Sequence, residues 1–152
     1  MKNIKEKQIK ACNLLCVLLL AVMLVTQFTP FWELDGQTTS ISSYVWLPSD
    51  HADLTAHFEQ SVGSDYTINT MVLPSVFQLI LPVLGIILFF NNREGIFTSI
   101  ISMCAGAAGI WTYLCKPAFR LGAWQVPFAV SIILLAASII AIIMYSKQSK
   151  DN

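Results

Sequence analysis

Four long apolar runs make up most of this chain, and none of them contains Asp, Glu, Lys, Arg or His; they cover residues 11–32, 71–90, 96–114 and 123–145. About 20 helical residues, rising about 1.5 Å each, cross the roughly 30 Å hydrocarbon core of a bilayer. Only 12% of the 152 residues are charged and 55% are hydrophobic, whereas soluble domains carry about 25% charged residues. The sequence therefore predicts an all-α membrane protein, a four-helix transmembrane bundle that forms a single domain over residues 1–152.

The first apolar run has an alternative interpretation as a cleaved signal peptide, because a Lys-rich head precedes it. The run is long for the apolar part of a signal peptide, and no Ala-x-Ala site follows it. Phe28, Phe31 and Trp32 instead resemble the aromatic belt at a membrane interface, and Pro30 is expected to end the helix. These features favour a retained membrane span.

The basic residues are sorted between the two sides of the predicted bundle. One side receives Lys2, Lys5, Lys7, Lys10, Arg93, Lys147 and Lys150, and the other side receives only Lys116 and Arg120. Because cytoplasmic loops carry an excess of Lys and Arg, the sequence predicts a cell-membrane protein with both termini in the cytoplasm. Residues 33–70 then lie outside.

The outer segment, residues 33–70, holds six carboxylates and both histidines, but no Lys or Arg. Thr38–Leu47 is rich in β-branched and aromatic residues and predicts a strand, with a hairpin as one arrangement. Ser49–Ser61 predicts a short helix with a Ser or Asp cap. We therefore expect a small extracytoplasmic cap on the bundle.

Charge on the predicted outer face is mostly negative. Two interpretations remain open: the cap docks its carboxylates on the second outer connector, or a negative face remains for a cationic partner. Two basic residues cannot neutralise six carboxylates, so some negative charge should remain. The residues concerned are Asp50, Asp53, His57, Glu59, Lys116 and Arg120.

Metal and cofactor sites are not expected. His51 and His57 are six residues apart, roughly 120° around a helix, so their side chains would not converge on an ion. The four cysteines form no Cys-x-x-Cys pair. Cys12 and Cys16 share one helix face, where palmitoylation is the alternative to packing as small buried hydrophobes.

Small residues mark the third run, in which Ser102 and Gly106, and Ala105 and Gly109, form small-xxx-small pairs. Such pairs allow helices to approach closely in lipid. They are expected to pack against the chain's own spans, or alternatively against another subunit.

A polar residue and a proline stand together in the second run. Pro82 is expected to kink the span and to free a backbone carbonyl. Gln78, four residues earlier, is expected to hydrogen-bond across helices, with ion or substrate binding as the alternative.

The sequence contains few of the residues and motifs that are typical of enzymes, ion-coupled carriers or nucleic-acid-binding proteins. The runs lack the ionisable groups that ion-coupled carriers and membrane enzymes need. No glycine-rich phosphate loop or paired-His zinc motif is present, and no basic patch suggests nucleic acid. We therefore predict a non-catalytic interaction or accessory protein of the bilayer, which contacts another membrane subunit or its own copies. The alternative is a small oligomeric transporter or channel lined by the second and third spans.

The predicted plan is similar to that of claudin-like tetraspans, which have four spans, cytoplasmic termini, a long first outer loop with β structure and a short second one. Pro30-Phe31-Trp32 and Trp46-Leu47 are similar to tryptophan placements in that family's first outer segment. The family's Trp-Gly-Leu-Trp stretch and its loop cysteine pair are absent from residues 33–70. The resemblance therefore concerns topology, and it does not imply adhesive strands or paracellular pores.

Overall fold

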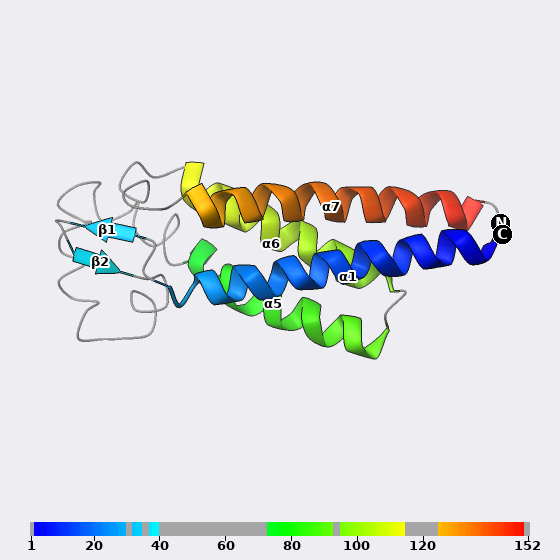
Figure 1. Ribbon diagram of the computed structural model, residues 1–152, viewed down its shortest axis with the longest axis horizontal. Coiled ribbons are helices and arrows are strands. Elements are labelled where there is room, and N and C mark those ends of the chain that lie inside the picture. The colour runs from blue at the N-terminus through cyan, green and yellow to red at the C-terminus, as the bar shows by residue number, and fades with distance from the viewer. Residues whose placement is uncertain are drawn as a thin grey trace.

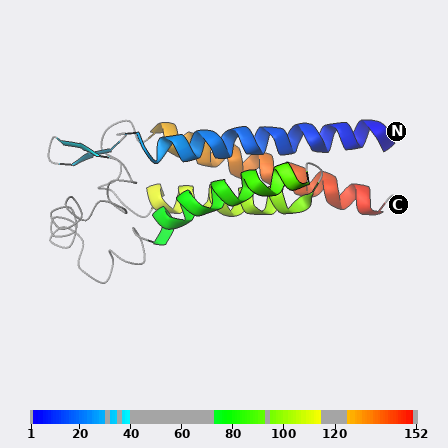
Figure 2. The same ribbon diagram turned by 90° about the horizontal axis from the view of Figure 1, so that it is seen from below.

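The computed structural model describes four helices and one pair of short strands, within residues 2–29, 32–34, 37–39, 73–92, 95–114 and 125–150. The helices are α1 (Lys2–Thr26), α5 (Leu73–Asn91), α6 (Ile96–Leu114) and α7 (Gln125–Lys150). They lie side by side along the long axis of the molecule, and α1 begins at the end of the bundle where α7 ends (Figures 1 and 2).

The four helices close into one bundle. Helix α6 packs between α5 and α7, and α1 packs against α5 and α7 from the other side. The core between them is built from one cluster of buried apolar side chains, which comprises Cys16, Leu20, Met23, Ala105, Leu134 and Ala137. Because α6 and α7 each contribute an alanine to this cluster, Ala105 and Ala137, their backbones can approach closely there.

Polarity in this bundle is distributed opposite to that of a soluble protein. Many large apolar side chains are exposed on the outer surface, including Leu18, Val25, Ile80, Ile87, Phe90, Phe97, Ile133 and Ile140. Neutral polar side chains are buried inside, including Asn13, Gln27, Gln78, Thr98, Ser99, Ser102, Thr112, Ser131 and Ser138. A large contiguous apolar exterior is rare on soluble monomers.

Two of the helices are long and apolar enough to cross a membrane: residues Glu6–Thr26 within α1 and Gln125–Ser149 within α7. The apolar stretches of the other two are shorter, Val76–Asn91 in α5 and Ile96–Thr112 in α6. By length and composition, the described residues therefore provide two candidate spans, where the sequence predicts four.

The predicted boundaries agree with the helices to different degrees. The third run was predicted as 96–114, the range of α6. Helix α1 instead includes the basic head, because Lys, Gln and Glu are good helix formers. It also ends at Thr26, well before Trp32. There the Thr26 hydroxyl donates to the Met23 carbonyl at 2.6 Å, and the Thr29 hydroxyl donates to the Thr26 carbonyl at 3.0 Å. Such side-chain bonds compete with the helix.

A short hairpin follows α1. Strand β1 (Trp32–Leu34) pairs antiparallel with β2 (Gln37–Thr39), with Leu34 opposite Gln37. The two residues between the strands in sequence are Asp35-Gly36, a pair favoured in two-residue hairpin loops. The predicted strand Thr38–Leu47 shares only its first two residues with β2. Its remainder and the predicted helix Ser49–Ser61 lie outside the described residues.

Candidate functional site

Three buried polar side chains tie three helices together at the end of the bundle away from the chain termini. We call Gln27, Gln78 and Thr112 the glutamine cluster; all three are 0% exposed. Gln27 Nε2 donates to Gln78 Oε1 at 3.3 Å, and Gln78 Nε2 donates to Thr112 Oγ1 at 2.5 Å. The cluster therefore links the end of α1 to the beginning of α5 and the end of α6.

The hydrogen bonds of the glutamine cluster run in one direction. Thr112 Oγ1 donates to the Ala108 carbonyl at 2.9 Å, which makes it an acceptor for Gln78. Gln27 Nε2 also donates to the Met23 carbonyl at 3.1 Å, and this contact fixes the orientation of its amide. Gln27 Oε1 is buried and has no hydrogen-bond partner among the described residues. At the Gln27 end, where this chain of donors begins, one buried acceptor can therefore receive a further hydrogen bond.

A second buried polar contact joins α1 to α6 nearer the chain termini. Ser99 Oγ donates to Asn13 Oδ1 at 2.7 Å, and Asn13 Nδ2 donates to the Gly95 carbonyl at 3.3 Å. Asn13 and Ser99 are both fully buried. Sequence analysis missed Asn13 and Gln27; the available signal was an amide side chain within a run that is otherwise apolar.

The small residues of α6 pack against the chain's own α7. A Cβ on Gly106 would lie 2.9 Å from the Leu135 backbone nitrogen and 3.0 Å from the Ser131 carbonyl oxygen. A Cβ on Gly109 would meet the Ser131 side chain and lie 2.9 Å from Met23 Cε of α1. The glycines therefore allow α6 to approach two neighbouring helices.

The other members of the two small-xxx-small pairs are also buried. Ser102 and Ala105 are 0% exposed, and Ser102 Oγ donates to the Thr98 carbonyl at 2.7 Å within the same helix. This hydroxyl thus needs no partner from another subunit.

Helix α5 continues through Pro82, which is buried in the bundle. Gln78 and Pro82 are one turn apart, so both face the interior where α1 and α6 pack. Of the two predicted intramembrane residues, Gln78 makes cross-helix hydrogen bonds, while Pro82 is buried within the continuous helix.

The predicted outer-face residues lie outside the described residues. These are Asp50, Asp53, His57, Glu59, Lys116 and Arg120, and the same is true of His51. Within the described ranges, no three or more His, Cys, Asp or Glu side chains gather as a group that could hold a metal ion.

The described polar clusters consist of neutral amides and hydroxyls. Such groups can orient helices and bind a polar ligand, but they supply neither a strong base nor an activated nucleophile. No protein-family model, curated protein or solved structure matches this chain. Its function must therefore be argued from the bundle itself.

Proposed function

We propose that this chain is a non-catalytic, multi-pass membrane protein that acts through contact with another protein, as an accessory subunit. The observation that carries this proposal is the reversed polarity of the bundle, with apolar side chains outside and hydrogen-bonded amides and hydroxyls inside. In lipid, interhelical hydrogen bonds and small residues hold helices together, since lipid offers no hydrophobic drive between them. The same arrangement in water would leave the apolar surface exposed.

All four helices are proposed to cross the bilayer. Helices α5 and α6 have 19 residues each, which corresponds to about 28 Å at 1.5 Å per residue. They pack beside α1 and α7 along the same axis (Figure 1). Helix α5 also exposes Phe77, Ile80, Val83 and Ile87 on its outer surface. If α1 and α7 lie in a membrane, this exposed face lies in it too.

The orientation can be tested by labelling single cysteines in a variant without native cysteines. Ser43→Cys is expected to react with an impermeant maleimide added to intact cells, and Ser149→Cys only after the cells are opened. The physical reason is the excess of Lys and Arg on the side of the chain termini. Labelling of both positions from the same side would contradict four crossings.

The contact with a partner is proposed to use the acidic outer segment, residues 33–70. Support comes from the charge of this segment, which has six carboxylates and no Lys or Arg. The glycine face of α6 is already covered by α7, so it is better assigned to packing within the chain than to a partner.

Native mass spectrometry after mild extraction from the host membrane tests this contact. We expect a second polypeptide at a fixed ratio, and at least a tenfold lower recovery for Asp50→Asn/Asp53→Asn/Glu59→Gln, because paired charges at an interface stabilise and steer association. The matched control is Lys147→Gln/Lys150→Gln, which changes charge at the other end of the chain. The proposal is contradicted if the triple variant recovers as much of the second polypeptide as the Lys147→Gln/Lys150→Gln control does.

A small oligomeric transporter or channel is the second candidate. The specific observation in its favour is Gln27 Oε1, a buried acceptor without a partner among the described residues, beside the α5–α6 contact through Gln78 and Thr112. A homo-oligomer in the same mass spectra would favour this function over an accessory subunit.

A further inference from the structure

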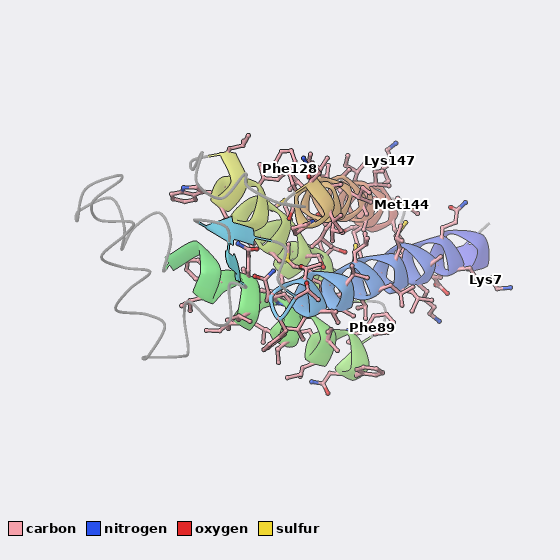
Figure 3. All side chains as sticks on the ribbon, turned by 60° about the vertical axis from the view of Figure 1, so that its left-hand side comes forward. Lys7, Phe89, Phe128, Met144 and Lys147 are labelled. Atoms are coloured by element: carbon pink, nitrogen blue, oxygen red, sulfur yellow. The ribbon has the colours of Figure 1, made fainter. Side chains whose placement is uncertain are left out.

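Three sulfur-containing side chains, two on α1 and one on α7, lie in the half of the bundle that contains the chain termini. Cys12 Sγ lies 3.7 Å from Met144 Sδ, although the two residues are 132 positions apart in sequence. Cys16, one turn further along α1, is fully buried, and its side chain has a hydrogen bond with Ser102 of α6. Figure 3 shows Met144 on the side of α7 that faces α1. We call these three residues the sulfur cluster.

Helix geometry places the Cys16 side chain within reach of the Cys12–Met144 contact, once it leaves its hydrogen bond with Ser102. Residues four apart on a helix have Cβ atoms about 5–6 Å apart on one face, and helical side chains lean toward the N-terminus of their own helix. The Cys16 side chain therefore leans toward Cys12. Helices α1 and α7 run in opposite directions (Figure 2), so the Met144 side chain leans toward the level of Cys16. There the fully buried Ala141 presents only a methyl group.

The spacing of the sulfur atoms matches that of two ligands on one metal ion. A first-row metal ion lies about 2.3 Å from a bound sulfur, so two sulfurs at tetrahedral or trigonal angles around it are about 3.7–4.0 Å apart. The Cys12–Met144 separation of 3.7 Å falls in this range. No large rearrangement of either helix is needed for an ion to join them.

The identity of the ligands selects the ion. Thiolate and thioether ligands together favour Cu(I), whereas structural Zn(II) sites use four Cys, His or carboxylate ligands. We propose that Cys12, Cys16 and Met144 bind one Cu(I) ion. Each thiol releases its proton to water as its sulfur bonds to the ion, and the oxidation state of the copper does not change. The thioether binds through a lone pair.

The burial of the cluster provides both access and protection. Cys12 and Met144 are partly exposed, which gives the ion a route in, whereas Cys16 is closed off within the core. This site goes beyond contact with a partner, because it lies within a single copy of the bundle.

The test is anaerobic titration of the purified, reduced full-length protein in detergent with Cu(I) held by the coloured chelator bathocuproine disulfonate. We expect one Cu(I) to be withdrawn from the chelator per chain, and X-ray absorption of the product to show sulfur ligands only. Cys12→Ser/Cys16→Ser should abolish this withdrawal. Met144→Leu, which conserves volume, should weaken Cu(I) binding about tenfold or more.

Matched variants separate the cluster from the other sulfurs. Met103→Leu on α6 and Cys104→Ser/Cys115→Ser should leave the stoichiometry and affinity unchanged. The proposal is overturned if no copper is withdrawn, if the Cys12/Cys16 variant retains it, or if Met144→Leu binds as the wild type does. One ion per two chains would also overturn it. Because Met144→Leu is expected to fold, its result stands even if the double serine variant does not fold.

Discussion

Replacing Gly106 with leucine is expected to separate α6 from α7 and to lower the free energy of unfolding by at least about 3 kcal/mol, at the upper end of the overpacking range. Even the first carbon of a side chain would lie 2.9 Å from the Leu135 backbone nitrogen and 3.0 Å from the Ser131 carbonyl oxygen. Backbone atoms of a helix cannot turn aside as a side chain can. The only relief is movement of one whole helix, which opens the core cluster around Ala105 and Leu134.

The measurement is unfolding of the purified protein in mixed micelles, followed by helix content. Alanine provides the sharpest comparison, because Ala is favoured over Gly in a helix by up to about 1 kcal/mol. At Gly85 an added Cβ would lie 2.6 Å from Leu20 Cδ1, the end of a side chain that can rotate, and 3.3 Å from the Ile101 Cγ2 methyl group. Gly85→Ala should therefore be nearly neutral, whereas Gly106→Ala should destabilise by about 1–3 kcal/mol. Equal effects at the two glycines would contradict the assigned contact.

The same variants distinguish packing within the chain from packing against a partner. If the glycines serve the α6–α7 contact, then Gly106→Leu loses the fold and the partner together. If a variant at Gly106 keeps its stability and loses only the partner, then the glycine face of α6 is a contact with another subunit. Small-xxx-small pairs serve either purpose, so the sequence pattern alone leaves both open.

The four helices could be predicted from the sequence, because an uncharged apolar run of about 20 residues is compatible with few other structures. It was less informative about helix ends. The head of α1 carries Lys and Glu, which read as a polar flank, yet these residues extend the helix. At the other end of α1, the hydroxyls of Thr26 and Thr29 donate hydrogen bonds to backbone carbonyls three residues earlier, and these bonds help to end the helix. Such competition is local and leaves no periodic signal.

The buried polar contacts were predicted only in part. Gln78 was expected to bond across helices and does so, but its partners Gln27 and Thr112 are 51 and 34 residues away in sequence. Asn13 and Ser99 are 86 residues apart. Each pairing depends on how the helices rotate against one another, and that rotation follows from the whole set of packing contacts. A single sequence therefore identifies candidates for buried polar groups more readily than it identifies their partners.

Replacing Gln78 with methionine, which has a similar length, is expected to lower the free energy of unfolding by about 1–2 kcal/mol. The variant loses two interhelical hydrogen bonds, each contributing about 0.6 kcal/mol on average in membrane helices. The groups left behind keep other bonds: Gln27 still donates to the Met23 carbonyl, and Thr112 still donates to the Ala108 carbonyl. The loss should therefore be smaller than that of Gly106→Leu, which has no such compensation.

A double-mutant cycle with Gln27→Met isolates the α1–α5 part of this effect. If the 3.3 Å contact between the two amides is a structural tie, the combined loss in Gln27→Met/Gln78→Met should be smaller than the sum of the single losses, by about 0.5–1 kcal/mol. Thr112→Val gives the same comparison for α5 and α6. Solute flux into liposomes provides a contrasting measurement. If Gln78 has only a structural role, neither the wild type nor Gln78→Met is expected to support flux. Solute flux that the wild type supports and a stably folded Gln78→Met abolishes would contradict the structural role and favour the transport function.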